Sequence, residues 1–294
     1  MYTITNNKLI LQPYLTKGGV WDDGILTFSI PHSSPAMEAN SYYFNQEEWA
    51  KAYLQYCHQD EEFRSLWQAA MGSWDGKIVV DVGCGPGNLL ACLGGSPKLM
   101  IGVDIAKGSL KIAEKFGYVP ILADAHNLPL VSGFADIVTL NATLHHCDDM
   151  GKVLAEAARL LKPGGILISD RDQQLSSMNF KGISALLWRS RVWVWRLLRK
   201  GAHASREHQK RMLATEIHVD KPGDGVFPEL YFHTLEPMGF SVNVYPHNNQ
   251  VGAAVLQGNY GKAMWHWRFV QRLSGINPYT PEAAMSLMCV ARKK

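Results

Sequence analysis

The fold of this 294-residue chain is decided by one stretch, Lys77-Ile-Val-Val-Asp-Val-Gly-Cys-Gly-Pro-Gly-Asn-Leu-Leu90. It opens with a short, β-branched, apolar run, which is typical of a strand buried on both faces of a parallel sheet. Gly83, Gly85 and Gly87 follow, and the leucines after them predict the first turns of a helix. Glycine permits a sharp turn and lets a ligand approach the backbone where a Cβ atom would collide. The stretch therefore predicts a strand, a glycine turn and a helix N-terminus, which form a nucleotide-binding crevice at the end of a parallel sheet.

A carboxylate inside the predicted strand indicates which class of nucleotide the crevice binds. Asp81 gives the order Asp-x-Gly-x-Gly-x-Gly, whereas a dinucleotide site needs Gly-x-Gly-x-x-Gly, and residue 88 is Asn. This carboxylate repels a pyrophosphate and attracts a ligand with a cationic amino-acid end. The stretch resembles motif I of the class I S-adenosylmethionine-dependent methyltransferases, in which the loop wraps the methionine part of the cofactor. A glycine-rich turn that binds no ligand is the alternative for the stretch taken alone.

The ends of the next strands supply further candidate ligands. Residues 98–104 predict a second strand ending in Asp104, about twenty residues beyond the glycine loop, where a ribose-binding carboxylate is expected. Capping of the following helix is a compatible role for this residue. The resemblance implies that Asp124, after the third strand, accepts from the adenine amino group and that Ala125 offers a backbone N–H. With S-adenosylmethionine as the implied cofactor, the candidate binding residues are Asp81, Gly83, Cys84, Gly85, Gly87, Asp104, Ile105, Asp124, Ala125 and Asn141.

The motifs after the third strand narrow the resemblance. Residues 134–140 predict a fourth strand, followed by Asn141-Ala-Thr-Leu-His-His146. A helix over 149–161 then ends at Leu161-Lys-Pro-Gly-Gly165, before a fifth strand. This order resembles the ubiquinone/menaquinone-biosynthesis-like (methyltransferase type 11) branch, over about residues 77–170. The resemblance implies an α/β, doubly wound, Rossmann-like fold with a seven-stranded, mostly parallel sheet, an antiparallel last strand and a helical lid insertion.

Four parts are expected along the chain. Residues 1–75 form an N-terminal extension and helical cap, 76–172 the S-adenosylmethionine-binding core, 173–225 a helical lid insertion, and 226–294 the C-terminal part of the core sheet. In the extension, residues 9–15 and 25–30 alternate loosely and predict short strands. Its aromatic segment Tyr42-Tyr43-Phe44 either closes over the cofactor or packs half-buried.

The lid insertion is rich in tryptophan and arginine. Residues 183–200 predict one helix, and residues 202–216 predict a second, more polar one. We interpret this pair as a lid over the acceptor site. For the first helix we favour a buried cap over a helix lying on a membrane surface. Trp265, Trp267 and Phe269 indicate a further helix between the last two strands, near the acceptor pocket.

Composition limits the partners. The net charge of +3 does not require a nucleic-acid partner, and the 47% hydrophobic content supplies a large core. The five cysteines are scattered without a Cys-x-x-Cys pair, which indicates free thiols in a reducing compartment. Neither a signal pattern nor an apolar run of bilayer length is evident. We expect a cytoplasmic protein, and the oligomeric state stays open.

Methyl transfer needs alignment of donor and acceptor and, for a hydroxyl or ammonium acceptor, removal of a proton. The candidate bases lie at the carboxyl edge of the sheet, and a structural role is the alternative for each of them: His145, His146, His247, Asp170 and Asp172. The three histidines are the favoured catalytic candidates. No clustered Asp/His set indicates a metal. We expect a small, hydrophobic or aromatic acceptor, methylated on oxygen, nitrogen or carbon.

A noncatalytic S-adenosylmethionine-binding regulatory module and a methyltransferase acting on a macromolecule are the alternatives. The sequence Asn141-Ala-Thr-Leu is not Asn-Pro-Pro-Tyr, and no Pro-Cys follows the fourth strand. Both observations argue against nucleic-acid methylation. A nonenzymatic module has no need of an acceptor pocket, whereas the aromatic insertion favours one.

Overall fold

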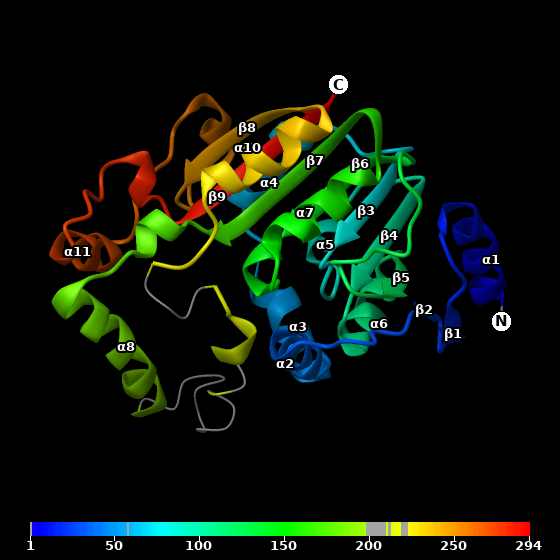
Figure 1. Cartoon of the computed structure of the whole chain (residues 1–294), viewed down its shortest axis with the longest axis horizontal. Coiled ribbons are helices and arrows are strands. Elements are labelled where there is room, and N and C mark those ends of the chain that lie inside the picture. Colours follow the sequence, from blue (N-terminus) through cyan, green and yellow to red (C-terminus); the bar gives the residue numbers. More distant parts are fainter. Residues whose placement is uncertain (1, 58, 198–209, 211–212, 219–222) are drawn as a thin grey trace.

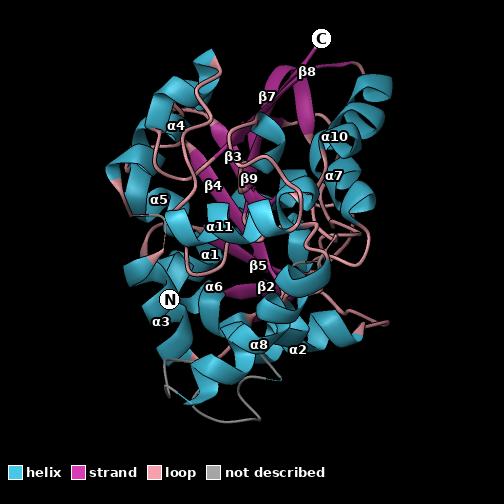
Figure 2. Ribbon diagram, turned by 90° about the vertical axis from the view of Figure 1, so that its left-hand side faces the viewer, coloured by secondary structure: helices cyan, strands magenta, loops and turns pink. Residues whose placement is uncertain are grey.

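A nine-stranded sheet crosses the molecule, with helices on both of its faces (Figures 1 and 2). The computed structural model describes residues 2–57, 59–197, 210, 213–218 and 223–294. The strands are β1 Val20–Asp22, β2 Ile25–Thr27, β3 Ile78–Val82, β4 Leu99–Asp104, β5 Val119–Leu122, β6 Ala135–Asn141, β7 Leu161–Gln173, β8 Phe240–His247 and β9 Ser286–Lys293. The helices are α1 Tyr2–Leu11, α2 Pro35–Phe44, α3 Glu47–Tyr56, α4 Glu61–Met71, α5 Asn88–Leu93, α6 Lys107–Lys115, α7 Met150–Arg159, α8 Gly182–Leu197, α10 Pro228–Leu235 and α11 Trp265–Leu273.

The sheet has the order β1-β2-β5-β4-β3-β6-β7-β9-β8. Strands β5, β4, β3, β6 and β7 run parallel, and β9 lies antiparallel between β7 and β8. The predicted α/β fold with a mostly parallel sheet and an antiparallel last strand is confirmed. Chain order reverses on either side of β3, which is where ligands bind in sheets of this kind.

The predicted strand count of seven is corrected to nine. The hairpin of β1 and β2 extends the sheet beside β5, where Thr27 pairs with Leu122. This pairing covers a strand that would otherwise expose unpaired backbone groups at an edge. The strand predicted for residues 9–15 was wrong, because this segment lies in α1 and a 3-10 turn. Only Leu11 of its aliphatic residues is fully buried there, whereas Leu9 and Ile10 are exposed.

Side chains of the central strands alternate between two cores. Val80 and Val82 pack on the face covered by α7 and α10, whereas Val79 packs on the face covered by α4 and α5. In register with Val80 lie Ile101 of β4 and Val138 of β6, which belong to the first core. The two-residue period of a strand and burial on both faces explain why this sequence is almost continuously apolar.

The helix predicted for residues 183–200 is present as α8 up to Leu197, and residues 198–200 lie outside the described residues. The further helix is present as α11, but none of its residues lines the cavity at the strand ends. The two helices contact each other at the end of the molecule opposite α1, through Phe180, Trp188 and Trp267 (Figure 1). Ile183 and Leu186 on α8 are exposed, whereas Trp188 packs against Trp267. Helix α8 is therefore covered on one face only. The helix predicted for residues 202–216 falls largely outside the described residues. Among those described, no helix is both long and apolar enough to cross a bilayer.

Candidate active site

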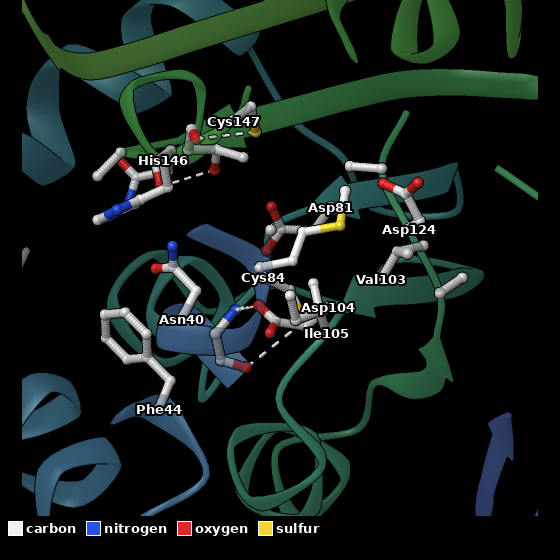
Figure 3. Close-up of a pocket in the computed structure, with 18 of the residues that line it drawn as sticks. Asn40, Phe44, Asp81, Cys84, Val103, Asp104, Ile105, Asp124, His146 and Cys147 are labelled. Atoms are coloured by element: carbon white, nitrogen blue, oxygen red, sulfur yellow. Dashed lines mark hydrogen bonds between the residues drawn. The ribbon is translucent and has the colours of Figure 1, made fainter. Parts of the chain in front are cut away.

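A cavity opens at the carboxyl ends of β3, β4, β5 and β6 (Figure 3). Residues from α2, α3 and the ends of these four strands line it. The sequence-predicted binding residues that line it are Asp81, Gly83, Cys84, Gly85, Asp104, Ile105, Asp124, Ala125 and Asn141. Of the predicted set, Gly87 does not line it. Gly87 has a φ of +90°, and an added Cβ would come within 3.0 Å of Tyr118.

The glycine turn is held close to β4 by backbone hydrogen bonds. The N–H groups of Gly83 and Cys84 both donate to the carbonyl of Val103, at 2.8 and 3.1 Å. Gly83 has no room for a side chain, because a Cβ there would lie 2.5 Å from Thr143. Gly85 differs, since its φ is +52° and its missing Cβ would meet nothing within 4 Å. The turn therefore leaves open space beside Gly85 on the cavity wall.

Asp104 ends β4 with its carboxylate held at two points. The N–H groups of Gly85 and Ala106 donate to Oδ2 and Oδ1, both at 2.8 Å. The bond from Ala106 ties Asp104 to the residue just before α6 without capping that helix, and the bond from Gly85 fixes the glycine turn. Burial raises the pKa of Asp104, and these backbone hydrogen bonds oppose the rise. Both oxygens retain lone pairs for a ligand's hydroxyl groups.

Asp81 is the most deeply buried of the cavity carboxylates, at 1% exposure. Tyr118 donates its hydroxyl to Oδ2 at 2.9 Å, and Thr139 donates to Oδ1 at 2.8 Å. Burial raises the pKa of Asp81 to about 7, although both hydrogen bonds act in the opposite direction. A nearby cation would lower this pKa again. The carboxylate is thus suited to a positively charged ligand group.

Asp124 and His126 form a fixed pair at the other side of the cavity. Oδ1 of Asp124 accepts from the backbone N–H of His126 at 2.8 Å and lies 2.7 Å from Nδ1 of its ring. Nε2 of His126 accepts from the backbone N–H of Asp149 at 3.2 Å, so the proton belongs on Nδ1. Burial raises the pKa of Asp124, but the hydrogen bonds from His126 outweigh it and hold the pKa below its usual value.

The N-terminal cap reaches the cavity through α2. Asn40 and Phe44 lie beside His146 on one side of the cavity, facing the carboxylates (Figure 3). Phe44 is the member of the aromatic segment that lines it, while Tyr42 is 47% exposed. The cap is tied down where Ser41 donates to the carbonyl of Ile105 at 3.2 Å.

Further residues that line the cavity lie outside the sequence-based binding set. They are Met37, Asn40, Tyr53, Asn88, Leu89, Val103, Ala123, His126, Ala142, Thr143 and Cys147. Asn88 and Leu89 lie in the glycine-turn stretch, and Ala142 and Thr143 follow Asn141, so these four are in recognised motifs. For His126, the sequence left stacking on adenine and exposure to solvent as alternatives. The residues from α2 and α3 reach the cavity through helix packing, which no local pattern encodes.

Of the three predicted bases, His146 lines the cavity, and the ring of His145 lies against it, with 4.0 Å between the two ring centroids. Nδ1 of His145 is 2.8 Å from Oδ1 of the buried Asp172, and the backbone N–H of His145 donates to the same oxygen at 3.1 Å. Burial lowers the pKa of His145, but Asp172 and Glu216 outweigh it and raise the pKa overall. Burial and the neighbouring His145 lower the pKa of His146.

His247 lies away from the cavity. Its Nε2 is 2.8 Å from Oδ1 of Asp170, and Trp67 donates to Oδ2 of the same carboxylate at 3.0 Å. His247 and Asp170 are both buried, at 1% and 0% exposure. Burial raises the pKa of Asp170, but the charge of His247 and its hydrogen bond reverse this and lower the pKa. The group is a buried polar network between β7, β8 and α4.

The polar groups that line the cavity fit S-adenosylmethionine better than a dinucleotide. Three carboxylates line the cavity, and the described lining contains neither lysine nor arginine. Oδ1 of Asn88 is buried without a hydrogen-bond partner among the described residues. It is therefore available to accept from an ammonium group. The space beside Gly85 admits a ligand close to the backbone.

Comparison with known proteins agrees with this geometry. Residues 80–169 match a family model described as a methyltransferase domain. A ubiquinone biosynthesis O-methyltransferase of Bordetella avium is 34% identical over 160 residues, which are 51% of this chain and 64% of that protein. The corresponding protein of Bordetella bronchiseptica is 33% identical over 50% of this chain and 62% of its own length. The chain thus spans less than two thirds of these curated relatives.

Two solved structures share the fold at low identity. One is geranyl diphosphate C-methyltransferase from Streptomyces coelicolor, in complex with Mg²⁺, geranyl diphosphate and S-adenosyl-L-homocysteine, with a TM-score of 0.56, 11% identity, and coverage of 90% of this chain and 99% of that one. The other is the cyclase SpnF, with a TM-score of 0.52, 14% identity, and coverage of 94% and 99%.

The matched domain begins in β3 and ends in β7, so it contains the glycine turn and the strand ends that build the cavity. Residues 80–169 therefore form a methyltransferase domain, and the chain resembles the class I S-adenosylmethionine-dependent methyltransferases.

Proposed function

We propose that this protein transfers the methyl group of S-adenosylmethionine to a small, hydrophobic or aromatic metabolite. One observation carries the proposal: the cavity combines an open glycine turn with three carboxylates and lacks a described lysine or arginine. Such a lining attracts the cationic sulfonium and ammonium groups of this cofactor and repels a pyrophosphate.

Each carboxylate has a distinct proposed role in holding the cofactor. The two anchored oxygens of Asp104 accept hydrogen bonds from the ribose hydroxyls. Asp124 accepts from the adenine amino group, and the backbone N–H of the neighbouring Ala125 faces the ring. Asp81 and Asn88, on either side of the glycine turn, hold the amino-acid end.

Residues on the Phe44 side of the cavity form the proposed acceptor end. When bound, the cofactor supplies a methyl group already activated on a sulfonium. The protein holds the acceptor in line with it, while α2 shields the reacting atoms from water. Nδ1 of His146 donates to the carbonyl of Thr215 at 2.6 Å, which leaves a lone pair on Nε2. That lone pair can take a proton from an acceptor or bind a cation.

The acceptor class follows from the lining and from the relatives. Apolar area predominates in the cavity, whose acceptor end includes Phe44 and Met37. The curated relatives are named as O-methyltransferases of ubiquinone biosynthesis, which favours a hydroxyl on an aromatic ring. Methylation of nitrogen or carbon stays a possible variant of the same chemistry.

A labelling experiment tests the proposal. Protein and methyl-labelled S-adenosylmethionine are incubated with a panel of phenols, catechols, amines and prenylated rings, and label in the organic phase is counted. We expect label with a phenol or catechol, and a loss of at least tenfold in Asp104→Ala, whose ribose contacts are removed. Glu62→Gln, an exposed carboxylate on α4, is the matched control.

A noncatalytic binding module is the second candidate. The cyclase SpnF shares the fold but is described by a reaction other than methyl transfer, so the fold is also compatible with a module that transfers no methyl group. Tight cofactor binding without label in any acceptor, including small molecules extracted from cells, would support the module and contradict methyl transfer. Unchanged transfer by Asp104→Ala would contradict the assignment of the ribose site.

A further inference from the structure

Two adjacent histidines and a glutamate that is distant in the sequence lie close together at the edge of the cavity. His145 and His146 belong to a 3-10 turn after β6, and Glu216 comes from the described segment 213–218. One ligand atom from each of the three lies within 4.8 Å of the other two. Nε2 of His145 is 3.6 Å from Oε2 of Glu216. The ring centroids of His145 and His146 are 4.0 Å apart.

Both imidazole rings are oriented through Nδ1. His145 is held by the carboxylate of Asp172, which is 0% exposed, and His146 is held by the carbonyl of Thr215. A carbonyl oxygen only accepts, so Nδ1 of His146 carries the proton and Nε2 the lone pair. Histidines that bind metals almost always donate their other ring N–H to a carboxylate or a backbone carbonyl. Both rings of this cluster have that arrangement.

An ion pair between a protonated His145 and Glu216 explains only part of the cluster. It does not account for the position of His146, whose ligand atom lies within 4.8 Å of those of the other two residues. Two imidazoles and one carboxylate are a ligand set used for zinc and for non-haem iron, and imidazole suits these ions better than Mg²⁺. We propose that His145, His146 and Glu216 bind a divalent transition-metal ion.

The ion would act on the methyl acceptor, and this role rests on the proposed function. Three protein ligands leave at least one coordination position for another group. Because His146 also lines the cavity, that position is at its edge, where an acceptor hydroxyl can bind. The ion favours release of the hydroxyl proton to solvent. The oxygen's electron pair then forms the bond to the methyl carbon, while the carbon–sulfur bond breaks and leaves its pair on sulfur.

Metal titration of the full chain tests the site without relying on activity. Protein stripped with chelator is titrated with Zn²⁺ by calorimetry and with Co²⁺ by visible absorption. We expect one ion per chain, at least tenfold weaker binding in Glu216→Gln and His146→Gln, and roughly 10- to 100-fold weaker binding in Asp172→Asn. His233→Gln, an exposed histidine on α10, is the matched control and should bind as the unaltered protein does.

Two outcomes would overturn the site. The first is no saturable binding by the unaltered protein, which would leave the cluster as an ion pair. The second is equal affinity in Glu216→Gln, His146→Gln and the control. Melting curves establish that each variant is folded, and Glu216 is partly exposed, so its substitution is mild. S-adenosylmethionine titration of the same samples separates the proposals: cofactor binding without metal binding overturns only the metal site, and the reverse result overturns only the proposed function.

Discussion

Substitution of Asp81 by asparagine should stabilise the ligand-free protein, and more so as the pH rises. Burial raises the pKa of this carboxyl from 3.8 to about 7. A raised folded-state pKa contributes stability that is present at low pH and is lost as the pH rises from about 4 through about 7. The difference between these pKa values corresponds to about 4 kcal/mol when the carboxyl is fully ionised. Asparagine does not titrate, so the variant does not lose this stability as the pH rises.

The assay is thermal unfolding of both proteins between pH 5 and pH 8. Roughly 2–3 kcal/mol of the cost develops over this interval, so the melting temperature of Asp81→Asn should gain roughly 5 °C on the unaltered protein. Asparagine can keep hydrogen bonds to Tyr118 and Thr139, whose hydroxyls now donate to Asp81. Glu62→Gln, an exposed carboxylate, should show no such gain.

The same substitution should weaken cofactor binding, because the ammonium group loses its counter-charge. Calorimetry in buffers of different ionisation enthalpy should show proton release by the unaltered protein near pH 7, and none from this site in Asp81→Asn. A difference in melting temperature that stays constant from pH 5 to pH 8, or a variant that loses stability as the pH rises, would refute the reasoning.

Three further predictions follow from single contacts. Gly85→Ala should cost about 1–2 kcal/mol of stability from its left-handed backbone but should lower cofactor affinity more than tenfold, because its methyl group enters the cavity; calorimetry showing unchanged affinity would contradict this. Trp67→Phe should lower the free energy of unfolding by roughly 2 kcal/mol in urea titration, since its bond to the Asp170 carboxylate is lost; an unchanged midpoint would count against that bond. His247→Gln should lower the melting temperature but leave cofactor affinity intact; a folded variant that fails to bind would place His247 in the site.

The sequence predicted those parts of the fold that local patterns encode. The run from Ile78 to Val82 alternates between two cores, and that burial produces its apolar composition. The glycine turn and the acids at the strand ends could be placed because parallel strands bring their carboxyl ends to one edge. The strand predicted for Leu9 to Leu15 was wrong because a short apolar segment fits both the strand period and the helix period. In this segment only Leu11 packs in the core.

Tertiary packing supplied the parts of the site that sequence patterns did not predict. Phe44 and Asn40 face the cavity because α2 is tied to the loop after β4, a contact between distant segments. His145 and His146 were predicted as bases, but no local pattern connects them to Glu216. The sequence placed His247 at the end of a strand, and therefore near the edge where ligands bind. Its ring is instead buried beside the carboxylate of Asp170.

Calorimetric titration with S-adenosylmethionine and, separately, with NAD tests the central claim most directly. The three cavity carboxylates and the open turn at Gly85 predict one molecule of S-adenosylmethionine bound per chain and no binding of NAD at the same concentration. Binding of NAD, or failure to bind S-adenosylmethionine by folded protein, would contradict the account.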